Sequence, residues 1–332
     1  MRFADGITAQ VESLRTSVTA VSKAVTGLDL PRSENTSVAF VGIGASYYAA
    51  WVGAAHLRAD GGRAFAASPG ELLSGEGGQA DVYVAVSASG RSRETVEVMR
   101  ARGAAVQIGV AKTAESPLND VVDAVISTDS GADTSPCTTS YSATALAVGM
   151  LADRISGRSA GGWERVPELV ERTIAESAGP VSRAGEMIHH VSSVDLVGSG
   201  ASFGSAGEGA LLLREFPRVA ATAWETYNYL HGPMESNDGS KAVIVLGDGR
   251  EVDLARSLAG FGIPTVLLTE QDVPEAANLV VCRLAADGGP AVRALAEIVP
   301  LQILTSGWAA ERGIEECNFR YRQTDTKVKS AA

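Results

Sequence analysis

Three serine hydroxyl groups lie close together in the segment Ser87–Ser92, which reads SASGRS. The segment follows an apolar run and precedes a helical pattern, so free backbone N–H groups and the positive end of a helix dipole would face the same space. Gly90 allows the backbone to approach a bound group closely. Donors of this kind favour a binding site for a phosphate dianion. An ordinary strand-to-helix turn with a serine N-cap accounts for the same residues equally well.

A second candidate is His231, one of only four histidines in the chain. It lies in the segment Glu225–Ser236, which reads ETYNYLHGPMES, directly before a Gly-Pro pair. An imidazole titrates near neutral pH and can exchange a proton with a substrate. The segment is also rich in turn-forming residues, so a loop residue without a chemical role is the alternative.

The chain carries one pattern twice, which is the signature of an internal repeat. Each copy opens with an apolar run, a Gly-x-Gly-Ala-Ser turn and a helix of small residues, beginning at Val38 and, 156 residues later, at Val194. Three further apolar runs follow in each copy, beginning at Asp81, Ala104 and Val122 in the first and at Lys241, Gly262 and Ala277 in the second.

Apolar runs with little alternation are typical of parallel strands that are buried on both faces. Helical patterns such as SRETVEVMRARG and EVDLARSLAGFG stand between them, and this alternation predicts an α/β fold with helices on both sides of a parallel sheet. We place the first unit at residues 1–155 and the second at residues 163–332, with a linker around Ser156–Gly162. Helices are expected over Ile7–Val25 before the first copy and Ala291–Arg312 after the second.

The two copies differ at the loop that follows the second apolar run. In the second copy the place of the serine loop is taken by Gly247–Arg250, which reads GDGR. The carboxylate of Asp248 would repel a phosphate. The second copy carries His231 instead. We therefore expect one composite active site, with the anion pocket from the first copy and acid–base groups from the second.

Composition limits the classes of partner. The chain has 332 residues, is 45% hydrophobic and carries a net charge of −11. A nucleic-acid surface would require a basic face, so we expect no nucleic-acid partner. The sequence contains no run of 18 apolar residues, and its first residues lack the basic and apolar regions of a secretory signal. These features predict a cytoplasmic protein that does not enter a membrane.

Signals for a metal or a cofactor are weak. Cys137, Cys282 and Cys317 are far apart and odd in number, so they form neither a disulfide framework nor a metal-binding spacing. We expect them to pack as small apolar groups. The turn GIGASY lacks the third glycine of the dinucleotide fingerprint, and no acidic residue ends the next strand at the usual distance. We therefore expect neither a metal nor a cofactor.

A set of short motifs resembles one family. The set comprises GASY at Gly44, SASGRS at Ser87, CTTSYSATAL at Cys137, EGALLLRE at Glu208 and LHGP at Leu230. With the paired α/β units, it resembles the sugar isomerase (SIS) domain proteins. The resemblance is greatest to the isomerase half of glutamine–fructose-6-phosphate aminotransferase and to stand-alone fructosamine-phosphate deglycases and ketose-phosphate isomerases. It implies two tandem flavodoxin-like units, each a five-stranded parallel sheet flanked by helices.

The resemblance also implies where a sugar phosphate would bind. Hydroxyl and backbone groups of the serine loop would hold the phosphate, from Ser87, Ala88, Ser89, Gly90 and Ser92. The sugar side of the pocket would be lined by Gly44, Ser46 and Thr138.

Three further residues match the catalytic groups of the family. Glu215 matches the carboxylate that moves a proton between C1 and C2. His231 matches the histidine that helps to open the sugar ring and usually enters the site of a neighbouring subunit, which requires at least a homodimer. Lys327 matches a C-terminal lysine that can form a Schiff base with a keto sugar, with Lys329 as the alternative. The simpler explanations are a solvated helix-end charge for Glu215, a turn residue for His231 and a frayed tail for Lys327.

Several positions depart from the aminotransferase pattern. Leu212 and Ser140 stand where it has lysines, Ala45 where it has a threonine, and Ala88 where it has the glutamine of the phosphate loop. No glutaminase domain precedes the first copy, and no cysteine follows Met1. We therefore do not expect synthesis of an amino sugar from glutamine.

Three hypotheses follow from these observations. The first is an enzyme that isomerises or deaminates a sugar or amino-sugar 6-phosphate by moving a proton between C1 and C2. The second is a lyase or dehydratase that acts on an N-substituted amino-sugar 6-phosphate. The third is a non-catalytic sensor of phosphosugars, a class weakened by the lack of a helix-turn-helix pattern before the first copy.

Overall fold

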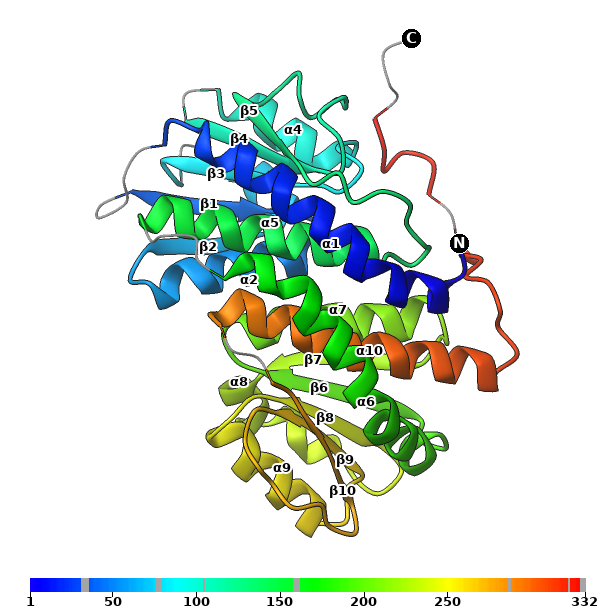
Figure 1. The fold of residues 1–332 in the computed structure, drawn as a ribbon. Coiled ribbons are helices and arrows are strands. Elements are labelled where there is room, and N and C mark those ends of the chain that lie inside the picture. Colours follow the sequence, from blue (N-terminus) through cyan, green and yellow to red (C-terminus); the bar gives the residue numbers. More distant parts are fainter. Residues whose placement is uncertain are drawn as a thin grey trace.

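Two five-stranded parallel sheets organise the molecule, as the computed structural model shows (Figure 1). It describes residues 1–30, 36–75, 79–103, 105–157, 162–285, 288–321 and 323–328. The first sheet has the order β2-β1-β3-β4-β5 and the second β10-β9-β8-β6-β7, so both have the flavodoxin-like order 2-1-3-4-5. The strands are β1 (Ser37–Val41), β2 (Arg63–Ala67), β3 (Val82–Val86), β4 (Val106–Ala111), β5 (Ala124–Ser127), β6 (Ser193–Gly198), β7 (Ala220–Glu225), β8 (Ala242–Leu246), β9 (Thr265–Thr269) and β10 (Leu279–Arg283).

Helices cover both faces of each sheet. Those of the first unit are α1 (Phe3–Thr26), α2 (Ala45–Ala59), α3 (Pro69–Leu73), α4 (Arg93–Ala101) and α5 (Thr139–Ser156). Those of the second are α6 (Val166–Ile188), α7 (Ala201–Glu215), α8 (Thr226–Leu230), α9 (Arg250–Gly260) and α10 (Pro290–Glu311), with short 3-10 turns at Trp163–Arg165 and Pro233–Ser236.

The predicted fold class is confirmed, including the parallel strands that are buried on both faces. All five residues of β3 and all five of β8 are buried. The expected helices over 7–25 and 291–312 are α1 and α10, which begin and end within a few residues of the predicted bounds. The boundary between residues 155 and 163 stays a prediction, and residues 158–161 of the predicted linker lie outside the described part of the chain.

The two units meet through their helices, which form a double layer between the sheets (Figure 1). One continuous core joins α1, α2 and α5 of the first unit to α6, α7 and α10 of the second. A Cβ atom at Gly204 would contact Val52, and one at Gly207 would overlap the Tyr48 ring, so these glycines of α7 allow it to pack closely on α2. This contact brings the second unit's α7 next to the pocket of the first unit. No helix in the described ranges is long and apolar enough to cross a bilayer.

Candidate active site

A pocket of about 680 Å³ lies at the carboxyl end of the first sheet, where the loops that follow β1 and β3 face each other. This is the point at which the strand order reverses, the usual ligand site of an open α/β sheet. The pocket brings together most of the predicted site residues. Those that line it are Gly44, Ser46, Ala88, Ser89, Ser92, Glu215 and Lys327.

The serine loop is shaped by Gly90, which has a positive φ of +60°. A Cβ atom there would overlap the Ser116 side chain, so only glycine fits this turn. Ser87 lies behind the loop rather than in the pocket wall, with 1% of its surface exposed, and its Oγ donates to Ser92 Oγ at 3.2 Å. Ser89 and Ser92 therefore present their hydroxyls to the pocket, while Ser87 supports Ser92 from beneath.

The C-terminal segment Thr326–Val328 crosses the start of α4 as a short antiparallel pairing. The Arg93 N–H donates to the Thr326 carbonyl at 3.1 Å, and the Val328 N–H donates to the Arg91 carbonyl at 2.9 Å. This pairing fixes the position of the lysine between them.

Lys327 Nζ donates to Ser92 Oγ at 3.1 Å and to Ser89 Oγ at 3.4 Å. Burial lowers the pKa of the Lys327 ammonium. The tail is therefore held in place here, and its lysine adds a cation to the serine loop. The alternative, Lys329, lies outside the described residues.

Glu215 is the last residue of α7 and lies half-buried where that helix reaches the pocket. Burial raises the pKa of Glu215 to about 7, and no described residue makes a hydrogen bond or ion pair with its carboxylate. A carboxylate with a pKa near neutrality can both accept and release a proton under ordinary conditions.

Two further predicted residues, Thr138 and His231, do not line the pocket. Thr138 is fully buried, its Oγ is 3.0 Å from Thr134 Oγ1, and its N–H donates to Asp133. His231 is exposed and follows α8, beyond the carboxyl end of β7, whereas Glu215 precedes the amino end of that strand. A six-residue strand spans about 20 Å. Within one chain His231 therefore lies far from Glu215.

Two acidic groups beside the pocket were missed by the sequence analysis. Asp133 lines the pocket and accepts hydrogen bonds from the N–H groups of Thr134 and Thr138, so it organises the loop before α5. Glu208 is 1% exposed, and burial, followed by the charge of Glu215, raises its pKa well above the usual range. A signal for Glu208 was available, because residues seven apart lie on the same face of a helix.

The equivalent position in the second unit holds a different pocket, of about 410 Å³, where the loops after β6 and β8 meet. Arg293 occupies it and pairs with Asp248, with Glu297 at 2.8 Å and with Glu270 at 3.3 Å. These carboxylates make the site unfavourable for a phosphate, which agrees with the expected loss of the anion pocket in this copy.

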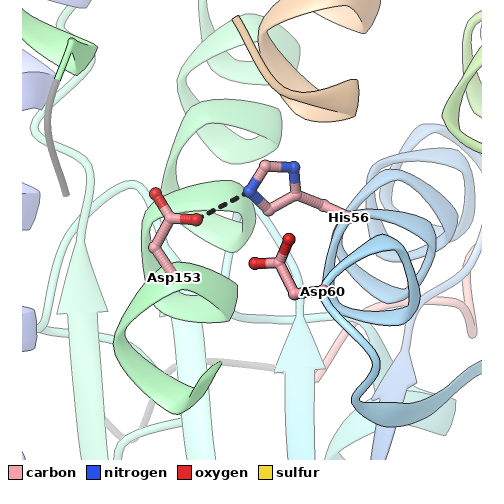
Figure 2. A group of neighbouring side chains, drawn as sticks. All are labelled: His56, Asp60 and Asp153. Atoms are coloured by element: carbon pink, nitrogen blue, oxygen red, sulfur yellow. Dashed lines mark hydrogen bonds and ion pairs between the residues drawn. The ribbon is translucent and has the colours of Figure 1, made fainter. Parts of the chain in front are cut away.

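Within the described ranges, one group of side chains meets the spacing of a metal site, namely His56, Asp60 and Asp153, whose ligand atoms lie within 4.8 Å of one another (Figure 2). The Ala291 N–H donates to His56 Nδ1 at 3.2 Å, so Nε2 carries the ring proton and donates to Asp153 at 2.8 Å. Trp163 Nε1 donates to the other Asp153 oxygen at 2.7 Å. With both ring nitrogens in use, the group fits a hydrogen-bonded junction between the units better than a metal site.

Burial raises the pKa of each of the three cysteine thiols, Cys137, Cys282 and Cys317. A thiol with a raised pKa is a poor nucleophile. This agrees with the expectation that the cysteines pack as apolar groups.

Comparison with known proteins supports the resemblance seen in the sequence. Residues 32–154 match the model of the SIS domain. The glutamine–fructose-6-phosphate aminotransferase of Pyrobaculum aerophilum is 28% identical over 251 residues, which cover 71% of this chain and 42% of that protein. The chain thus spans less than half the length of such curated relatives.

Solved structures share the fold over almost the whole chain. Glucosamine-6-phosphate deaminase from Thermotoga maritima superposes with a TM-score of 0.79 at 21% identity, covering 97% of this chain and 98% of that one. Tagatose-6-phosphate ketose/aldose isomerase from Escherichia coli gives a TM-score of 0.77 at 15% identity, covering 97% and 96%. Residues 32–154 are thus similar to the SIS domain, and the chain as a whole shares the fold of these solved structures.

Proposed function

We propose that the chain is an SIS-type phosphosugar isomerase or deaminase, which moves a proton between C1 and C2 of a sugar or amino-sugar 6-phosphate. The observation that carries this proposal is that Glu215, at the end of the second unit's α7, shares one pocket with Ser89, Ser92 and Lys327. The enzymes of similar fold named above act on phosphorylated sugars or amino sugars, which supports the same class of substrate here.

In this proposal the phosphate binds at the serine loop. The hydroxyls of Ser89 and Ser92 donate to the phosphate oxygens, and the ammonium of Lys327 offsets part of the phosphate charge. A Schiff base between Lys327 and a keto sugar, the role that the resemblance implies, would need the carbonyl rather than the phosphate beside the serine loop, so it is the alternative to this assignment.

Glu215 acts as the base at the other end of the sugar. Its carboxylate removes the proton from the carbon beside the carbonyl or imine, and the resulting carboxylic acid returns a proton to the neighbouring carbon. An amino sugar then loses its nitrogen when water hydrolyses the imine. Because the carboxylate form is the base and its pKa is about 7, turnover should increase as the pH rises through about 7.

His231 belongs to this mechanism only if it comes from a second copy of the chain. We propose a homodimer in which each subunit's His231 enters the pocket of its partner and exchanges a proton with the ring oxygen. The exposure of His231 at the end of α8 leaves it available for such a contact.

The test is incubation with a panel of sugar and amino-sugar 6-phosphates in D2O, followed by NMR. We expect deuterium at C1 or C2 of one substrate, with a loss of about 10²-fold to 10⁴-fold in Glu215→Gln. The matched control is Arg256→Gln, an exposed change on α9 outside the pocket. This variant should incorporate deuterium into the substrate at the wild-type rate.

Two results would replace the proposal by another function. A product that absorbs in the near ultraviolet, formed without net isomerisation, would indicate a lyase or dehydratase. Tight binding of a sugar phosphate without any deuterium incorporation or turnover would indicate a sensor.

A further inference from the structure

A second pocket, of about 480 Å³, adjoins the proposed active site on the far side of Glu215. Glu215 and Phe319 line both pockets, so they form the boundary between them. A sugar phosphate held at the serine loop, with its reacting carbon at Glu215, would therefore direct any substituent on that carbon toward the second pocket.

Three arginines line this second pocket, namely Arg214 from α7, Arg218 from the turn before β7, and Arg320 from the C-terminal segment. Arg214 Nε and Arg218 Nη2 donate to the backbone carbonyls of Ala221 and Asn318. None of the three forms an ion pair with a carboxylate among the described residues. Their positive charge is thus not neutralised within this part of the chain.

The surroundings of these arginines favour an anion. Among the described residues that line the pocket, the single acidic side chain is Glu215 itself. The three arginines therefore outnumber the carboxylates that line this pocket.

The backbone of Arg218 gives independent support. Arg218 has a φ of +60°, in the left-handed region that glycine adopts far more readily than arginine. Strained backbone is concentrated at functional sites, where a particular side chain is required in a particular place. An arginine at this position is consistent with a requirement for its guanidinium group.

We propose that the arginine pocket binds a carboxylate carried on a substituent at the reacting end of the sugar phosphate. The preferred substrate then carries two separated anions, with the phosphate at the serine loop and the carboxylate at Arg214, Arg218 and Arg320. The planar guanidinium group matches a carboxylate through paired hydrogen bonds. Phe319 and Tyr321 provide apolar surface for the atoms that link the carboxylate to the sugar. This inference rests on the proposed function.

The test compares three compounds by isothermal titration calorimetry and by exchange in D2O. They are fructose 6-phosphate and two 1-amino-1-deoxyfructose 6-phosphates of similar length, one with an N-carboxymethyl group and one with a neutral N-hydroxyethyl group. We expect the carboxymethyl compound to bind about 10-fold to 100-fold more tightly than the hydroxyethyl compound. The preference should shrink in high salt.

Two variants test the assignment of the arginines. Arg320→Gln removes an exposed charge, and Arg218→Gly removes a charge while suiting the backbone conformation, so it should fold at least as well as the wild type. Each variant should bring the ratio of the dissociation constants of the hydroxyethyl and carboxymethyl compounds close to one. Arg256→Gln on α9 should keep the wild-type ratio.

The outcomes separate the two proposals. Equal binding of the carboxymethyl and hydroxyethyl compounds by the wild type would overturn the arginine pocket, while exchange on fructose 6-phosphate that depends on Glu215 would leave the proposed function intact. If both arginine variants kept the wild-type preference for the carboxymethyl compound, the proposal that these arginines bind its carboxylate would be overturned as well. Failure of all three phosphates to bind would overturn both proposals.

Discussion

Glu208 and Glu215 lie two helical turns apart on the same face of α7, yet their surroundings differ. Glu215 lines the pocket and has a pKa of about 7. Glu208 is almost completely buried, and within the described residues its Oε2 has no hydrogen-bond partner. At neutral pH the Glu208 carboxyl therefore stays protonated, whereas the Glu215 carboxyl can gain and lose a proton. The same helix thus carries a neutral acid and, two turns further on, a group that titrates.

The buried carboxyl of Glu208 should make stability depend on pH. Above the ordinary pKa of a glutamate the unfolded chain releases this proton, while the folded chain keeps it, so the wild type loses stability as the pH rises. Glu208→Gln removes this loss. In urea unfolding between pH 5 and 8, the free energy of unfolding of the variant should rise relative to that of the wild type by up to about 1.4 kcal/mol for each pH unit.

The exposed change Glu97→Gln on α4 is the matched control. Its free energy of unfolding should differ from that of the wild type by the same amount at every pH. A constant difference between Glu208→Gln and the wild type over the same range would show that Glu208 is ionised in the folded protein.

The sequence identified side chains by type and spacing, and it failed where burial decides their role. The serine loop and Glu215 stand beside recognisable turns and helix ends, so their common pocket could be predicted. Thr138 belongs to an equally recognisable motif, but packing under α1 removes it from the pocket wall, since a Cβ atom at Gly6 would overlap its hydroxyl. The neutrality of Glu208 likewise depends on neighbours that are distant in the sequence.

At the level of elements, the turn between β3 and α4 shapes the end of the pocket where we propose that the phosphate binds. Gly90→Ala should destabilise the fold by about 1–3 kcal/mol, because alanine opposes the positive φ and would overlap Ser116. It should also weaken binding of fructose 6-phosphate, because Ser89 and Ser92 would move with the backbone. Thermal unfolding and calorimetric titration measure the two effects.

Gly61→Ala is the control for the backbone cost alone. Gly61 has a φ of +84° at the end of α2, and no atom lies within 4 Å of the place of its Cβ. This variant should lose stability but bind the sugar phosphate as the wild type does. If Gly90→Ala also retained wild-type affinity, the serine loop would not be the phosphate site.

The central strands and the edge strands β5 and β10 were predictable, whereas the edge strands β2 and β7 were not. β3 and β8 appear in the sequence as continuous apolar runs because each is covered on both sides. The edge strands β2 and β7 are mostly half-exposed and rich in alanine, so neither forms such a run. The pairing of Thr326–Val328 with the start of α4 also lacked a local signal, because it depends on a partner more than 230 residues away.

At the scale of the whole molecule, the repeat has diverged into two different environments. The first unit keeps a polar pocket at its switch point, and the second fills the equivalent place with the Arg293 ion-pair cluster. The close packing of α7 on α2 supplies the first unit with Glu215 from the second. Each chain thus builds one candidate site from both units.

A test of subunit exchange follows from the position of His231 beyond the far end of β7. If His231 acts in the partner's site, mixing the inactive variants Glu215→Gln and His231→Ala should restore about a quarter of wild-type activity through mixed dimers with one intact site. Refolding the two together and measuring exchange in D2O would detect this.

Mixing Glu215→Gln with Ser89→Ala should restore nothing, because both residues belong to the same chain's pocket. An active monomer in analytical ultracentrifugation, or His231→Ala with full activity, would exclude a role for His231 in trans.

The pairing of Lys327 with the serine loop has a bearing on biosynthesis. The pocket draws on residues from Gly44 to Lys327, so a growing polypeptide that has already folded its first sheet still lacks both Glu215 and Lys327. If the proposed function holds, activity can appear only after the ribosome has released nearly the whole of this sequence. A premature stop codon within the last turn of α10 would leave the serine loop in place without its lysine.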